Sequence, residues 1–118
     1  MEKNAKAVMN EAMNLLGYTE RNGNERLTRR ITNKAIPVLN SVYADIWQIE
    51  SEEPFAPVVS LTDAIALRER AMECLVYGFA AFIAQSESDA DNQSLWMSIY
   101  NKKRAGLSKT DRIQNVLP

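Results

Sequence analysis

Residues 77–104 read YGFAAFIAQSESDADNQSLWMSIYNKKR, and the fold class follows largely from this stretch. Its first part is apolar and rich in small residues, its middle is polar and acidic, and its last part repeats apolar residues at helical spacing. This order is typical of two antiparallel helices joined by a short turn. We therefore expect a tightly packed helical hairpin that ends in the basic cluster Lys102-Lys103-Arg104.

The first arm of this hairpin belongs to a helix that we expect from about Arg68 to Ser86. Its apolar residues lie on nearly all sides, which is typical of a helix buried at the centre of a domain. Small residues between them, such as Gly78 and Ala81, allow neighbouring backbones to approach closely. The second arm is expected from about Asp91 to Ala105, with an inner face made of Leu95, Trp96, Ile99 and Tyr100.

Two further helices are predicted before the hairpin. The first runs from about Asn4 to Leu16, and Gly17 supplies the left-handed residue that commonly ends a helix. The second runs from about Asn24 to Glu50, which makes it roughly 40 Å long. Because Pro37 removes a backbone donor within this pattern, we expect a kink or a break near residues 33–36.

The remaining segments connect or follow these helices. Ser51 to Pro57 contains two prolines and breaks the helical pattern, and Ser60-Leu61-Thr62-Asp63 matches a capping box that predicts a short helical turn. We expect a mobile C-terminal tail from about residue 107. The 118 residues suit a single domain, residues 1–118, so the sequence predicts an all-α, four-helix bundle-like fold with a long, Pro-kinked second helix.

Composition argues against several classes of active site. The chain contains no histidine, which removes the commonest general base and the commonest metal ligand. Its single cysteine, Cys74, excludes an internal disulfide and a cysteine-based zinc site. The longest apolar run, Cys74 to Ala84, is shorter than the ~20 residues that span a bilayer. We expect a soluble protein that is not an enzyme.

Acidic clusters do not form a recognisable metal or acid–base site. A calcium loop that began at Asp89 would need glycine at its sixth position and a carboxylate at its twelfth, where this chain has Ser94 and Tyr100. These acids instead favour the start of a helix. The glutamates at 50, 52 and 53 lie in a proline-rich segment and suit a solvated loop. We expect no cofactor and no metal.

Charges are grouped along the chain although the net charge is only -1. Basic residues gather in residues 20–34 and 102–112, whereas every charge in residues 45–53 is acidic. Separated positive and negative surfaces can attract copies of one protein to each other head to tail. Trp47 lies beside the acidic loop, residues 51–57. Tryptophan is enriched among the residues that contribute most of the binding energy of an interface. The candidate subunit-interface residues are Arg29, Arg30, Lys34, Trp47, Glu50, Glu52, Glu53, Lys102 and Arg104.

The specific hypothesis pairs Arg29, Arg30 or Lys34 with Glu50, Glu52 or Glu53 of a neighbouring copy. An alternative function starts from the same basic residues. Together with Arg26 they lie at the start of a long helix, a placement that suits a small nucleic-acid-binding or regulatory module. The acidic pI of about 5.5 and the lack of interleaved aromatic residues argue against this alternative.

Several short motifs extend over residues 15–104. They are Leu15-Leu16-Gly17-Tyr18, Asn40 with Tyr43-Ala44-Asp45, Val59-Ser60-Leu61 with Asp63-Ala64-Ile65-Ala66-Leu67, Tyr77-Gly78, Asp89 to Gln93, and Tyr100-Asn101-Lys102-Lys103-Arg104. In these motifs the chain resembles the small head–tail connector (head-completion adaptor) proteins of long-tailed bacteriophages.

The resemblance implies a structural subunit without a catalytic site or a cofactor. Such subunits form a ring, commonly twelve-fold, that docks beneath the portal protein once the genome has been packaged. The ring bridges to the next tail-completion protein, and genomic DNA passes it without sequence-specific contact. The resemblance therefore implies a component of the virion that is present in the host cytoplasm during assembly.

Overall fold

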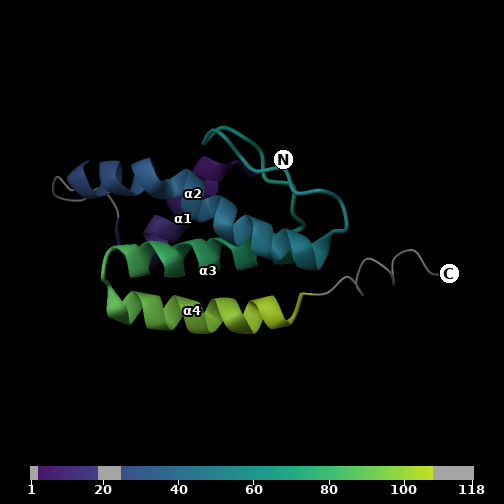
Figure 1. The fold of residues 1–118 in the computed structure, drawn as a ribbon. Coiled ribbons are helices and arrows are strands. Elements are labelled where there is room, and N and C mark those ends of the chain that lie inside the picture. Colours follow the sequence, from purple (N-terminus) through teal and green to yellow (C-terminus); the bar gives the residue numbers. More distant parts are fainter. Residues whose placement is uncertain (1–2, 19–24, 108–118) are drawn as a thin grey trace.

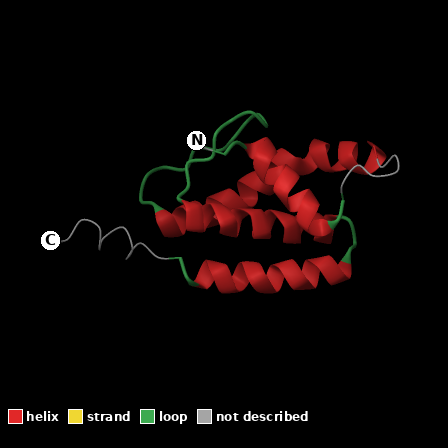
Figure 2. Cartoon of the chain, turned by 180° about the vertical axis from the view of Figure 1, so that it is seen from behind, coloured by secondary structure: helices red, strands yellow, loops and turns green. Residues whose placement is uncertain are grey.

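The computed structural model describes residues 3–18 and 25–107, and within them the chain is helical with connecting loops (Figures 1 and 2). The helices are α1 (Ala5–Leu16), α2 (Glu25–Glu50), α3 (Glu69–Ser86) and α4 (Ala90–Ala105). The described residues contain no β-strand, only an isolated bridge between Asn4 and Ala64. The predicted all-α class is confirmed. The predicted mobile tail from residue 108 lies outside the described residues, and Leu107, at its expected start, is buried.

Local sequence signals set both ends of α1. The Asn4 side chain accepts a hydrogen bond of 2.9 Å from the backbone N–H of Ala7, which satisfies one of the free donors at the helix start. Gly17 ends the helix in the left-handed conformation, with φ of 79°, and its N–H donates to the carbonyls of the last turn. The predicted role of Gly17 is confirmed.

Pro37 lies inside α2 without interrupting it. Of the kink or break predicted near residues 33–36, only the break is wrong, because the helix is continuous and Figure 1 shows it changing direction along its length. The carbonyl that loses its donor belongs to Asn33, and both Asn33 and Pro37 are exposed. Water can replace the missing hydrogen bond there, so the helix continues.

α3 is the central helix of the fold. It packs against α1, α2 and α4, and Figure 1 shows α4 on one side of α3 with α1 and α2 on the other. Residues on all its faces are buried, including Leu75, Phe79 and Ile83, as the sequence predicts. A Cβ atom added to Gly78 would lie 2.6 Å from Val42 and 2.6 Å from the Tyr100 ring. Glycine thus permits the close approach of three helices.

α4 is an outer layer, and its inner face is narrower than the sequence predicts. Tyr100 is buried, but Leu95 is 51% exposed and Trp96 is half-buried against Tyr77. The inward placement of Leu95 is wrong. Because α4 covers only one side of α3, a single stripe of side chains suffices to pack it.

Residues 51–68 form a loop that connects α2 to α3 and binds the start of α1. At residues 60–63, where the sequence predicts a short helical turn, the chain forms a single turn in which the N–H of Asp63 donates to the carbonyl of Ser60 over 3.1 Å, but no helix follows. The Asp63 carboxylate accepts hydrogen bonds from the N–H groups of Val59 and Ser60. The carbonyls of Leu61 and Asp63 accept from the N–H groups of Lys6 and Ala5, donors that α1 itself cannot satisfy.

Candidate interaction surface

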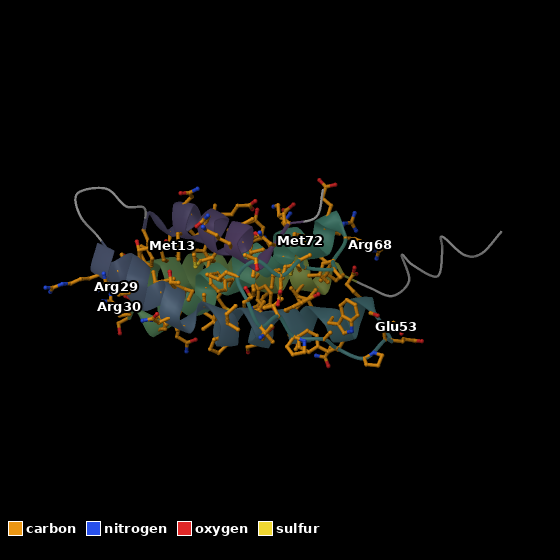
Figure 3. All side chains as sticks on the ribbon, turned by 90° about the horizontal axis from the view of Figure 1, so that it is seen from above. Met13, Arg29, Arg30, Glu53, Arg68 and Met72 are labelled. Atoms are coloured by element: carbon orange, nitrogen blue, oxygen red, sulfur yellow. The ribbon has the colours of Figure 1, made fainter. Side chains whose placement is uncertain are left out.

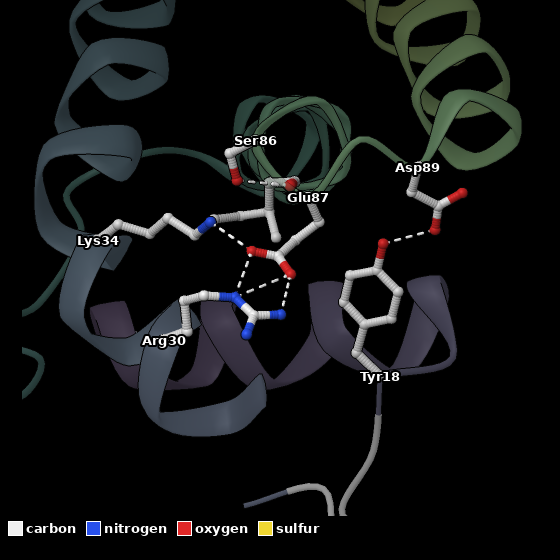
Figure 4. A network of polar contacts seen from close by, with 7 residues as sticks. Tyr18, Arg30, Lys34, Ser86, Glu87 and Asp89 are labelled. Atoms are coloured by element: carbon white, nitrogen blue, oxygen red, sulfur yellow. Dashed lines mark hydrogen bonds and ion pairs between the residues drawn. The ribbon is translucent and has the colours of Figure 1, made fainter. Parts of the chain in front are cut away.

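Two of the predicted interface cations bind a carboxylate of their own chain (Figure 4). Arg30 Nε lies 3.0 and 3.1 Å from the two carboxylate oxygens of Glu87, and its Nη2 contacts the same group. Lys34 Nζ lies 2.5 Å from Glu87 Oε2. The Glu87 side chain is only 9% exposed. These contacts fasten the N-terminal half of α2 to the residue that follows α3.

The electrostatics of Glu87 follow from this geometry. The hydrogen bonds from Arg30, with a smaller contribution from Lys34, lower the pKa of Glu87 from its usual 4.5 to about 2, although burial acts in the opposite direction. Glu87 therefore carries a negative charge at neutral pH that is largely used within the chain. The cluster is structural, and it reduces the positive charge that α2 can offer to a partner.

A second contact holds the turn between α3 and α4 from the other side. The hydroxyl of Tyr18 donates to Asp89 over 2.5 Å (Figure 4), and the Asn92 amide donates to the carbonyl of Leu16. Asp89 also accepts from the backbone N–H of Asn92 and so caps α4. Hydrogen bonding to Tyr18 lowers the pKa of Asp89, and burial together with Asp89 raises that of Tyr18. The acidic turn is thus a docking point for α1.

Arg26 and Arg29 remain available at the N-terminal end of α2. Both are exposed, and neither forms a hydrogen bond or ion pair with the described residues. Figure 3 shows Arg29 at one end of the molecule with its side chain directed away from the domain, and Glu53 lies at the opposite end. Positive charge at this end of α2 therefore lacks a partner in the described chain.

Part of the acidic end of α2 is likewise used in contacts within the chain. Glu50 is buried and accepts hydrogen bonds of 3.2 to 3.4 Å from the Arg68 guanidinium. Trp47 is half-buried, and its indole N–H donates to the backbone carbonyl of Glu53 over 2.7 Å. Glu52 and Glu53 are exposed. Trp47 thus secures the acidic loop, which presents carboxylates to solvent.

The two predicted residues in α4 differ from each other. Arg104 donates to both oxygens of Asp45 on α2, at 2.6 and 2.8 Å, and the hydroxyl of Tyr100 donates to the same carboxylate. Mainly because of Arg104, the pKa of Asp45 falls from its usual 3.8 to about 2. Lys102 is exposed and has no partner among the described residues. Arg104 therefore docks α4 on α2, whereas Lys102 stays available.

The described residues offer little support for a reaction centre. Nowhere in residues 3–18 and 25–107 do three or more His, Cys, Asp or Glu side chains gather as metal ligands would. Burial raises the pKa of the Cys74 thiol to about 12, so this cysteine stays protonated. None of the helices in this part of the chain is long and apolar enough to cross a membrane.

A groove of about 730 Å³ lies beside α1 and α2. Its walls come from one face of α1, from the N-terminal half of α2 and from the loop before α3. The lining residues are Lys6, Met9, Asn10, Met13, Asn14, Tyr18, Thr28, Thr32, Leu61 and Thr62. The sequence did not predict the groove residues as a binding surface, because three separate segments build it.

Comparison of the chain with models of protein families, with curated proteins and with solved structures gave no match.

Proposed function

We propose that this protein is a structural subunit that assembles with copies of itself, as the resemblance to phage head–tail connectors implies. The observation that carries the proposal is the placement of charge on α2. Exposed Arg26 and Arg29 lie at its first turns, and exposed Glu52 and Glu53 follow its last turn. The helix has 26 residues, so the two groups lie roughly 39 Å apart.

Charges of opposite sign at opposite ends favour a head-to-tail contact between copies. In such a contact each subunit uses two different surfaces, and a rotation that closes produces a ring. A ring of this kind is what a connector needs, since it has to surround the path of the DNA between head and tail. In the proposal the ring binds the portal protein on one face and a tail-completion protein on the other.

The in-chain ion pairs narrow the pairing that the sequence suggests. Arg30 and Lys34 are held by Glu87, and Glu50 is held by Arg68, so the proposed contact relies on Arg26 and Arg29 with the exposed Glu53. Exposed ion pairs contribute only ~0–1 kcal/mol each. Apolar surface has to supply most of the affinity, and Val59, which is 81% exposed beside the acidic loop, is a candidate.

Charge reversal tests this contact. Arg26→Glu with Arg29→Glu should weaken self-association, and so should Glu52→Arg with Glu53→Arg, as measured by sedimentation velocity at low salt. An equimolar mixture of the two variants should recover self-association, because the acidic surface of one variant matches the basic surface of the other. The pairing is wrong if both variants assemble like the wild type, or if their mixture shows no recovery.

The alternative, a nucleic-acid-binding module, rests on the same two arginines. Each phosphate contact releases counterions and adds roughly one to the slope of the logarithm of the binding constant against the logarithm of the salt concentration. Two available cations at the start of α2 predict weak binding with a slope near two. A gel shift with duplex DNA over a salt series would support this alternative if binding showed a slope of about two or steeper and were lost in the Arg26→Glu, Arg29→Glu variant.

A further inference from the structure

Residues 54–59, in the loop between α2 and α3, present apolar surface to solvent. Pro54, Ala56 and Pro57 are exposed, and Val59 is 81% exposed although valine is among the residues most often buried. Single exposed apolar side chains are common on soluble domains, whereas groups of them mark contact surfaces. This short segment therefore has the composition of a contact surface.

The backbone on both sides of Val59 is held in place. The Asn40 side chain on α2 donates to the carbonyl of Val58 over 2.8 Å and accepts from its N–H over 2.9 Å. The N–H of Val59 donates to the Asp63 carboxylate over 2.8 Å. Val59 is thus a fixed apolar projection, so binding to a partner costs this segment little conformational entropy.

A pocket of about 260 Å³ lies between α2 and α3, where Pro37, Val38 and Ser41 meet Phe82. Its lining is mostly apolar. Since a water molecule takes about 30 Å³ in the liquid, the pocket has room for the three carbon atoms of a valine side chain. It suits a small apolar group of a partner.

The projection and the pocket lie on different sides of α2. Val38 comes two residues before Asn40, so at about 100° per residue it points to nearly the opposite side of the helix from the side chain that binds the loop. Figure 1 accordingly shows the loop and α4 on opposite sides of the domain. One copy can therefore offer Val59 to one neighbour and its pocket to another, which is the geometry of a head-to-tail contact.

The charges near the two surfaces have opposite sign. Residues 51–67 contain acidic residues and no basic one, namely Glu52, Glu53 and Asp63. On the other surface, Arg30 and Lys34 precede Val38 at four-residue steps and share its side of α2. Both cations bind the single carboxylate of Glu87, which leaves a net positive charge beside the pocket. Opposite charges of this kind orient two surfaces as they approach.

We propose that Val59 of one copy binds in the pocket between α2 and α3 of a second copy. This contact rests on the proposed self-assembly of the chain and names an apolar surface for it. It places copies side by side, whereas the pairing of Arg26 and Arg29 with Glu53 places them end to end. Different substitutions therefore disrupt the two contacts.

Sedimentation velocity of single variants tests both surfaces. Val59→Glu and Ser41→Glu should each raise the dissociation constant for self-association roughly tenfold or more, because a carboxylate would then enter an apolar pocket. Both residues are exposed, so the fold should tolerate the changes. Ser98→Glu, at an exposed serine of α4, is the matched control and should associate like the wild type. Variants at Val59 and Ser41 that associate as tightly as this control overturn the proposal.

A mixture of the two variants tests which surface meets which. The Ser41→Glu chain keeps its Val59, and the Val59→Glu chain keeps its pocket. An equimolar mixture should therefore associate roughly tenfold more tightly than either variant alone. A mixture as weak as its two components means that Val59 does not bind in the pocket.

Disulfide trapping separates this contact from the proposed function. Chains with Val59→Cys should cross-link to tagged chains with Ser41→Cys and far less to tagged chains with Ser98→Cys, and Cys74 is buried in all of them. This cross-link without closed rings would support the contact and contradict the connector role. Assembly that charge reversal abolishes, with no preferred cross-link to Ser41→Cys, would support the proposed function and overturn the contact.

Discussion

At the scale of single residues, Gly78 is where three helices approach most closely. An added methyl group would meet Val42 on α2 and the ring of Tyr100 on α4, each at 2.6 Å. The Tyr100 ring cannot easily retreat, because its hydroxyl is held by Asp45. The small side chain is thus a condition for packing α2 and α4 against the same point of α3.

Gly78→Ala should therefore destabilise the fold. Alanine raises helix propensity by about 1 kcal/mol, but a carbon atom 2.6 Å from two side chains puts the cost of overpacking in the upper part of its usual range, ~2–3 kcal/mol, so we expect a net loss of about 1–2 kcal/mol in the free energy of unfolding. Urea denaturation measures the change. Gly106→Ala is the matched control, because its added carbon would lie 3.4 Å from a carbonyl oxygen, and its stability should be nearly that of the wild type. A Gly78→Ala variant as stable as this control would contradict the packing argument.

At the scale of elements, ion pairs join helices that the sequence cannot place side by side. Glu87 lies 57 residues from Arg30, and Asp45 lies 59 residues from Arg104. The helix ranges were predicted to within one residue, because periodicity and capping residues are local signals. Ion pairs between distant segments leave no such signal, so Arg30, Lys34 and Arg104 looked available for a partner.

The same limit explains why the turn at residues 60–63 does not continue into a helix. A capping-box pattern specifies which side chain can accept from which backbone donor, and Asp63 does accept from Val59 and Ser60. Whether a helix follows depends on the next residues and on their partners. Here the carbonyls of Leu61 and Asp63 serve α1, a tertiary contact that the local pattern does not contain.

Glu87 makes the stability of the fold depend on pH. Its pKa is about 2 in the folded chain and 4.5 ordinarily, so its contribution is complete above pH 4.5 and is lost as the pH falls toward 2. Glu87→Gln should lower the free energy of unfolding at pH 7 by about 1–2 kcal/mol, allowing for solvent screening at the exposed Arg30. The variant should also flatten the loss of stability between pH 4.5 and 2.

Thermal unfolding over a pH series measures both effects. Glu53→Gln, at an exposed glutamate of the acidic loop, is the control and should retain the wild-type stability at pH 7. If Glu87→Gln unfolded at the wild-type temperature at pH 7, the cluster with Arg30 and Lys34 would not fasten α2 to α3.

At the scale of the whole molecule, exposed charges of opposite sign lie at opposite ends of α2. Arg26 and Arg29 lie at one end of α2, the acidic loop lies beyond the other, and Lys102 lies on the outer helix. The groove beside α1 adds an apolar surface that the sequence did not reveal. Together these surfaces suit repeated contacts between identical copies, which is the basis of the proposed connector role.

Electron microscopy of the purified chain, alone and mixed with a bacteriophage portal protein, measures this assembly most directly. We predict closed rings with a central opening, either alone or on the portal, and their loss in the Glu52→Arg, Glu53→Arg variant. Monomers or closed two-fold dimers under every condition, with no particles bound to the portal, would contradict head-to-tail assembly into a ring.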